Sequence, residues 1–254
     1  RWDDSTLRFA RPIRWLLALY GTRPVAVIAG RLRSGRVTII GGPVRPRRVS
    51  CASPATFWAA VAKHGILLDE RRRRARIDEL VASAAAQHRG IPAPEAVTHG
   101  LLKEIANLVE RPVAFVGHFD PKYLALPREV LLASMGKYQR VVAIQTRAGA
   151  LLPQFVGVLD GAPRKLDMVR RMYEHILNAR LQDSLLFWEQ DRARSLAAMS
   201  HEVSGVTFHE KIGTMAQKQE RLAKLSGTLA QQWTLTSQES DALRQACQWS
   251  KADL

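Results

Sequence analysis

The sequence contains few cysteines and no long apolar run. Its 254 residues include two cysteines, Cys51 and Cys247, which are too few for a disulfide scaffold or for a metal site built from four thiolates. The most apolar stretch, residues 15–29, is interrupted by a glycine, an arginine and a proline, so it falls short of the ~18 residues that a membrane-spanning helix needs. These absences predict a globular protein of a reducing compartment, and we expect a cytoplasmic one.

The motifs of common catalytic sites are missing as well. The sequence has no glycine-rich phosphate loop followed by Lys-Ser or Lys-Thr, no dinucleotide fingerprint and no Gly-x-Ser-x-Gly elbow. His201 and His209 each precede a glutamate, but Gly205 and its β-branched neighbours interrupt the helix that would align them. We therefore expect no metal site in this chain.

Three carboxylates near an aromatic pair are the best remaining candidates for acid–base chemistry. They are Asp183, Glu189 and Asp191. Asp183 follows Arg180 by three residues, a spacing that favours an ion pair on a helix. We predict that Arg180 and Asp183 are structural residues at the junction between the two halves of the chain and that no residue of the chain is catalytic. An independent enzyme with a site near these carboxylates stays open as an alternative.

Arginine is what the sequence has in excess. Lysines and arginines number 38 against 23 aspartates and glutamates, a formal charge of +15, and residues 1–50 hold eleven arginines against two aspartates. Such a charge attracts polyanions and speeds their encounter, although a composition bias with arginines paired to carboxylates would give the same count. The candidate nucleic-acid contacts are Arg11, Arg14, Arg31, Arg33, Arg36, Arg45, Arg47, Arg48, Arg71, Arg72, Arg73 and Arg74. Lys211 and Lys218 are left undecided.

Hydrophobic periodicity predicts an α+β fold, with a mixed, mostly antiparallel sheet region and packed helices followed by an all-helical block. Strands are predicted at residues 9–20, 24–32, 37–40, 47–51, 112–119, 140–146 and 154–159. Helices are predicted at residues 54–63, 69–87, 95–110 and 126–134, and in every periodic segment from about residue 165 onward. Residues 90–94 are predicted to be a linker, and the last two predicted strands to form a hairpin.

These elements suggest three regions. Residues 1–111 form a basic α/β region, residues 112–188 an α/β region with the hairpin, and residues 189–254 a helical block. Two helix starts carry capping signals, namely Ser53 before Pro54, and Thr236 three residues before Glu239.

Several strings, taken in order along the whole chain, resemble the β subunit of the bacterial-type heterotetrameric glycyl-tRNA synthetase. They are Arg11-Pro-Ile-Arg-Trp15, residues 101–110 followed by Pro112-Val113, residues 124–131, residues 149–155, residues 179–183 and residues 208–214. The sequence departs from the family pattern directly after the string from Ser34 to Val37, which puts any RNA contact made there in doubt. The resemblance is to an internal fragment, with residues 189–254 leading into a truncated HD-type domain.

The resemblance implies a division of labour between two subunits. ATP, Mg²⁺ and glycine are expected on the α subunit, and this chain is expected to hold no cofactor. The β subunit is expected to bind tRNA(Gly) and to pack on α in an α2β2 assembly. The alternative is a structural scaffold, an interaction platform with no direct RNA contact.

Overall fold

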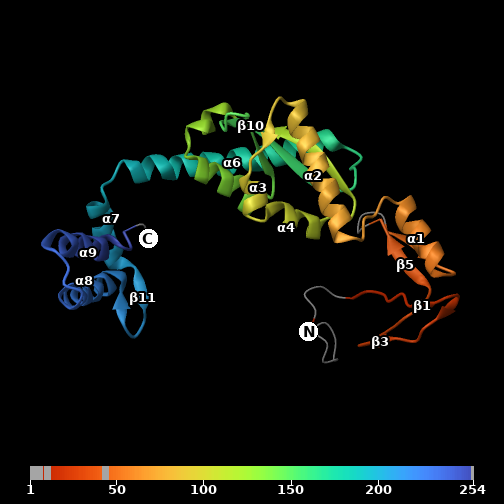
Figure 1. Ribbon diagram of the computed structural model, residues 1–254, viewed down its shortest axis with the longest axis horizontal. Coiled ribbons are helices and arrows are strands. Elements are labelled where there is room, and N and C mark those ends of the chain that lie inside the picture. The colour runs from red at the N-terminus through yellow and green to blue at the C-terminus, as the bar shows by residue number, and fades with distance from the viewer. Residues whose placement is uncertain (1–7, 9–12, 42–45, 253–254) are drawn as a thin grey trace. The chain divides into compact units, whose positions relative to one another are not determined.

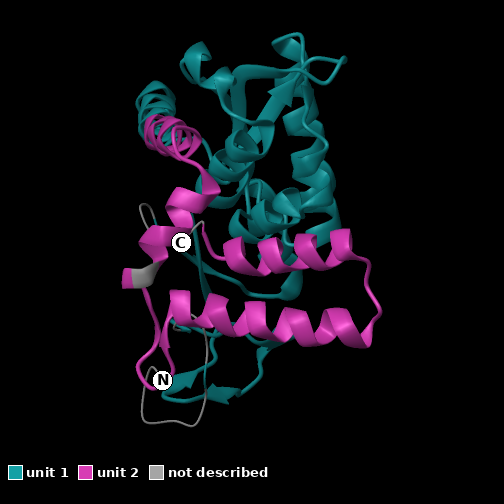
Figure 2. Ribbon diagram, turned by 90° about the vertical axis from the view of Figure 1, so that its left-hand side faces the viewer, with its two compact units in different colours: residues 1–181 teal, residues 182–254 magenta. Residues whose placement is uncertain are grey.

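The computed structural model describes residue 8 and residues 13–41 and 46–252. These fall into two compact units, which meet in sequence between Leu181 and Gln182 (Figure 2). The first unit combines helices with antiparallel sheets, and the second is mainly helical. The predicted α+β class is confirmed.

The described N-terminal part of the first unit consists of three small antiparallel hairpins. Their strands are β1 (Leu19–Tyr20) with β2 (Arg23–Pro24), β3 (Ile28–Ala29) with β4 (Leu32–Arg33), and β5 (Val37–Ile40) with β6 (Arg47–Ser50). The third hairpin matches the prediction for residues 37–40 and 47–51. It packs on α1 (Pro54–Lys63) through a small core of Ile40, Val61 and Ile66.

A four-stranded antiparallel sheet forms the centre of the first unit, with strand order β7-β9-β10-β8. Its strands are β7 (Ile91–Pro92), β8 (Pro112–His118), β9 (Val142–Gln145) and β10 (Leu151–Asp160). One face packs against α2 (Glu70–Gln87) and α4 (Leu101–Leu108) (Figure 1). Ile77, Val81 and Ile105 from the helices meet Val142, Ile144 and Val156 from the strands in one buried core.

This core changes two sequence-based expectations. Residues on both sides of position 111 share it, so the structure shows no separation of 1–111 from 112–188. The predicted linker at 90–94 contains the edge strand β7, where Pro92 pairs with Ile144. An edge position suits proline because it has no N–H to donate to a neighbouring strand.

The opposite face of the sheet carries two reciprocal glycine–phenylalanine pairs. Phe155 lies opposite Gly117, and Gly157 lies opposite Phe115. The two phenylalanine rings meet edge to face with centroids 6.3 Å apart, and the Phe115 ring also packs edge to face on Tyr173 of α6 at 5.1 Å. Each ring therefore occupies the space above the glycine on the neighbouring strand.

The helix predicted at residues 95–110 is two helices, α3 (Glu95–Thr98) and α4. Gly100 separates them in the left-handed region, with φ of 74°, where a residue without a Cβ is favoured. After β8, the chain forms η1 (Pro121–Ala125), α5 (Arg128–Leu132) and η2 (Ala133–Gln139), and η2 is a π-helical segment. The pattern of apolar residues at 126–134 indicated a helix there but not its π-helical continuation.

The long helix α6 (Leu166–Arg192) begins in the first unit and ends in the second. The second unit continues with α7 (Leu196–Glu202), η3 (Val203–Gly205), β11 (Thr207–His209), β12 (Gly213–Thr214), α8 (Met215–Gln232) and α9 (Ser237–Trp249). The β11–β12 hairpin interrupts what was predicted as helical throughout. Its β-branched residues favour strand, and Gly213, the first residue of β12, has a φ of 93°.

The predicted helix caps are present. Ser53 and Thr236 each form a capping box, with Thr56 and Glu239 as the reciprocal partners. A third box at Thr214 and Gln217 begins α8. The hydrogen bonds from Thr236 hold the pKa of Glu239 below its ordinary value, because they stabilise the ionised carboxylate.

The glycine–phenylalanine pairing predicts that Gly157→Ala destabilises the protein. An added Cβ would overlap the Phe115 ring, so we expect the free energy of unfolding to fall by ~1–3 kcal/mol through overpacking. Urea unfolding followed by circular dichroism measures it. Gly35→Ala is the control, because nothing lies within 4 Å of its Cβ position and we expect a change below ~0.5 kcal/mol. Equal losses in both variants would contradict this account.

Candidate nucleic-acid interface

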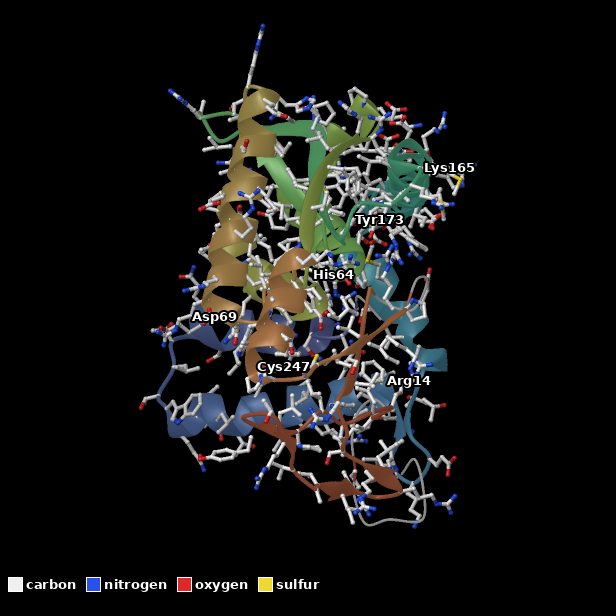
Figure 3. The ribbon with its side chains drawn as sticks, turned by 90° about the vertical axis from the view of Figure 1, so that its right-hand side faces the viewer. Arg14, His64, Asp69, Lys165, Tyr173 and Cys247 are labelled. Carbon is white, nitrogen blue, oxygen red and sulfur yellow. The ribbon has the colours of Figure 1, made fainter. Side chains whose placement is uncertain are left out.

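The hairpins of the first unit carry exposed arginines. Arg14 precedes β1 (Figure 3), Arg33 lies in β4, and Arg47 and Arg48 lie in β6, all four exposed. None of these four guanidinium groups forms an ion pair with another residue in the described ranges. An exposed cation that no neighbouring carboxylate neutralises is suited to contact phosphate oxygens. Arg31 is exposed as well, whereas Arg11 and Arg45 lie outside the described residues.

Adjacent arginines in β6 point to opposite faces of the hairpin because side chains alternate along a strand. Arg47 pairs with Ile40, on the side that packs on α1, and Arg48 pairs with Ile39 on the other side. Both side chains nevertheless reach solvent. The hairpin therefore presents positive charge on both of its faces.

Arg36 differs from its neighbours because its guanidinium group is engaged inside the protein. It donates to the backbone oxygen of Ala52 at 3.1 Å and to that of Thr22 at 2.6 Å. These bonds tie the turn between β1 and β2 to the segment before α1. They favour a structural role for Arg36 over an RNA contact.

The four arginines of the run Arg71–Arg74, at the start of α2, also divide into exposed side chains and side chains engaged within the protein. Arg71 and Arg72 are exposed and have no ion-pair partner among the described residues. Arg74 pairs with Asp78 at 2.9 Å. Arg73 donates to the backbone oxygens of Leu67, Leu68 and Ala106 at 2.5–3.1 Å. The geometry thus leaves the first two arginines available and engages the other two.

Helix α2 begins at a charged cap. The Asp69 carboxylate accepts a hydrogen bond from the backbone N–H of Arg72 at 2.8 Å. This bond, together with the neighbouring arginines, holds the pKa of Asp69 below its ordinary value. The aspartate therefore stays ionised and stabilises the first turn beside the exposed arginines.

The residues predicted to be structural lie on α6. The guanidinium group of Arg180 lies 5.5 Å from the centroid of the Tyr138 ring, a cation–π contact between α6 and η2. Asp183 is exposed and forms no ion pair within the described part of the chain. Glu189 and Asp191 are exposed too, so the three carboxylates do not share an enclosed site.

The two undecided lysines lie in the second unit. Lys218 places its Nζ 3.8 Å from the centroid of the Phe208 ring, which engages its charge against an aromatic face. Lys211 is exposed between β11 and β12. Of the two, Lys211 is the better placed to meet a polyanion.

Further exposed bases surround the start of α6 and were not among the predicted contacts. Arg164 and Arg171 are exposed and seven residues apart, and Lys165 lies between them beside the first turn of α6 (Figure 3). Arg23 in β2 is also exposed. Arg164 precedes α6 and Arg171 lies within it, so no helical period relates the two, and their basic character was the only signal of them in the sequence.

The described residues offer little for other kinds of site. No three His, Cys, Asp or Glu side chains among them gather in a group able to hold a metal ion. Within the same ranges, no helix has the length and apolar character needed to cross a membrane. An α+β chain with many solvent-exposed guanidinium groups on short hairpins and helix faces is typical of proteins that attract polyanions.

Comparison with known proteins narrows this class to one family. The family model described as glycyl-tRNA synthetase beta subunit matches residues 1–254. The chain belongs to the glycyl-tRNA synthetase beta subunit family, and the resemblance seen in the sequence is confirmed.

Three relatives illustrate the match, each named glycine–tRNA ligase beta subunit. The one from Syntrophomonas wolfei is 39% identical over 253 residues. Those from Moorella thermoacetica and Shouchella clausii are 34% identical over 254 and 255 residues. In all three the match covers 100% of this chain and 36% of the relative, so the chain spans little more than a third of their length.

The engagement of Arg73 predicts a stability effect that its neighbour does not share. Arg73→Ala leaves three backbone oxygens without their donor, and we expect the free energy of unfolding to fall by ~1–3 kcal/mol. Arg72→Ala removes an exposed side chain and should change it by less than ~0.5 kcal/mol. Urea unfolding of both variants measures the difference. Similar values for the two would contradict the structural assignment of Arg73.

Proposed function

We propose that this chain serves the attachment of glycine to tRNA(Gly) as part of a glycine–tRNA ligase β subunit, by binding tRNA and by packing on a catalytic α subunit. The observation that carries the proposal is the family match over the whole chain. The exposed arginines of the hairpins and of α2 support the RNA-binding part. The proposed location is the cytoplasm.

The chemistry of the reaction belongs, in this proposal, to the α subunit. ATP and Mg²⁺ would bind there, and an α2β2 assembly would bring the tRNA held by β to that site. The β chain then needs rigid cationic surface and shape complementarity, because folded RNA is held largely through its phosphates and its 2′-hydroxyl groups. Arg14, Arg33, Arg47, Arg48, Arg71 and Arg72 are the contacts that the geometry favours most.

A second candidate function is that of a scaffold without RNA contact. The paired arginines favour it, since Arg74 and Arg76 are neutralised by Asp78 and Glu79 on α2. In that case the surplus of arginine would play no part in tRNA affinity. The two candidates differ in their response to salt.

We expect tRNA(Gly) binding by the full-length protein to weaken steeply with salt, with a log–log slope of several units. The double variant Arg47→Ala, Arg48→Ala should weaken binding and reduce the slope by about 1 for each phosphate group that is no longer bound. Filter binding or fluorescence anisotropy across a salt series measures both quantities.

Lys224→Ala is the matched control, because Lys224 is an exposed base on α8 in the second unit. It should leave the affinity and the slope unchanged. A flat salt response of the unaltered protein would favour the scaffold. If both variants bind with the same steep salt dependence as the unaltered protein, then the protein binds RNA through residues other than those of β6.

A further inference from the structure

A cavity of about 800 Å³ lies in the first unit, in the space bounded by α3, α4, α5, η2 and β9. Its volume falls within the range of small-molecule sites. Its lining includes the buried apolar residues Ala93, Ala96, Leu101, Met135, Val141 and Ala143. The candidate RNA contacts of the hairpins and α2 take no part in this lining.

Small side chains and an unusual backbone create the hollow. Three of those six residues are alanines, and Gly136 adds a further gap, since an added Cβ there would meet Leu101 only at 3.6 Å. The wall between them is the π-helical segment η2, which is capped by the following residue, Arg140, with φ of 54° and ψ of 42°. Single-turn π segments and left-handed residues other than glycine occur often at functional sites.

The charged groups of the wall are matched in two pairs. Arg128 binds Glu95 through two bonds, from Nε to Oε1 at 2.8 Å and from Nη2 to Oε2 at 3.0 Å, and it also donates to Gln145 and to the backbone of Gly149. Arg140 pairs with Glu104 at 2.5 Å.

The pairing keeps both members of the first pair charged. Hydrogen bonds from Arg128 lower the pKa of Glu95, and the Glu95 carboxylate raises the pKa of Arg128. The side chains of both are only partly exposed, at 31% for Arg128 and 25% for Glu95. These two charges therefore neutralise each other at the wall of the cavity.

One acid and one base in the lining are left over. Glu129 and Lys137 both line the cavity, and neither forms an ion pair with another described residue. The Lys137 ammonium has an aromatic neighbour, the exposed Tyr138 ring, whose centroid lies 5.6 Å away. His99 lies at the exposed rim. In a chain with a formal charge of +15, this site is balanced, with three acids and three permanently charged bases.

We propose that this cavity binds a small zwitterion with an apolar body, of the size and chemistry of a free aliphatic amino acid. The apolar floor takes the body of the ligand. Glu129 meets its ammonium group, and Lys137 meets its carboxylate. A phosphate-rich ligand is disfavoured here because it would face the carboxylates of Glu95, Glu104 and Glu129.

Met135 is a built-in reporter for this site. It lies in the floor and is 1% exposed, while Met199 and Met215 belong to the second unit. In the full-length protein with ¹³C-methyl methionine, assigned by Met135→Leu, we expect L-leucine to shift the Met135 signal with a millimolar Kd. The signals of Met199 and Met215 should stay in place.

Two truncated probes test the zwitterion. Isocaproic acid lacks the ammonium group and isoamylamine lacks the carboxylate, and each should bind about tenfold more weakly than leucine because one charged hydrogen bond is lost. Glu129→Gln should weaken the binding of leucine and isoamylamine, whose ammonium group loses its partner, but should not weaken the binding of isocaproic acid, which has no ammonium group. No shift of Met135 with leucine, or equal affinities for all three probes, would overturn the proposal.

A filling variant separates binding in the cavity from binding elsewhere. Ala133 is an exposed residue of the lining, so Ala133→Phe should occupy the cavity without disturbing the core and abolish the shift. Ala86→Phe is the control, at an exposed alanine of α2 that is not part of the lining. A shift that survives Ala133→Phe in a folded protein would also overturn the proposal. The outcome is independent of tRNA binding, so it is distinguishable from a failure of the proposed function.

Discussion

The packing of α2 and α4 on the four-stranded sheet is the interaction on which the first unit depends. It brings Ile77 and Ile105 against Val142 and Val156 in one buried core. Burial of such aliphatic side chains contributes ~1.5–3 kcal/mol each. The same contact sets the direction of α2, and hence the side of the first unit on which Arg71 and the other bases of its first turn are displayed.

The elements with strong local signals could be predicted from the sequence. The helix at 69–87 has a clear apolar period and an aspartate cap, and the hairpin at 140–159 has a Gly149 turn between two apolar runs. The prediction of a single helix at 95–110 was wrong because Gly100 adopts a left-handed backbone conformation there. Neighbouring apolar residues gave the same period on both sides of it, which masked the break.

The candidate interface could be predicted only in part, for a different reason. The identity of a residue as arginine says nothing of whether its guanidinium group meets solvent or a backbone oxygen. Arg73 and Arg72 are adjacent in the sequence, yet one binds three carbonyl groups across the fold and the other is exposed. That distinction depends on how α2 approaches the loop before it and the end of α4, which no local pattern encodes.

Arg140 shows what the backbone of the cavity wall demands. It holds a left-handed conformation that costs an arginine ~1–2 kcal/mol and a glycine almost nothing. Glycine would therefore adopt this backbone conformation at a lower conformational cost than arginine. The side chain must offset the conformational penalty, and its bond to Glu104 is the visible means. The backbone N–H groups of Arg140 and Val141 both donate to the oxygen of Met135, so the turn after η2 is fastened by its own main chain as well as by this side chain.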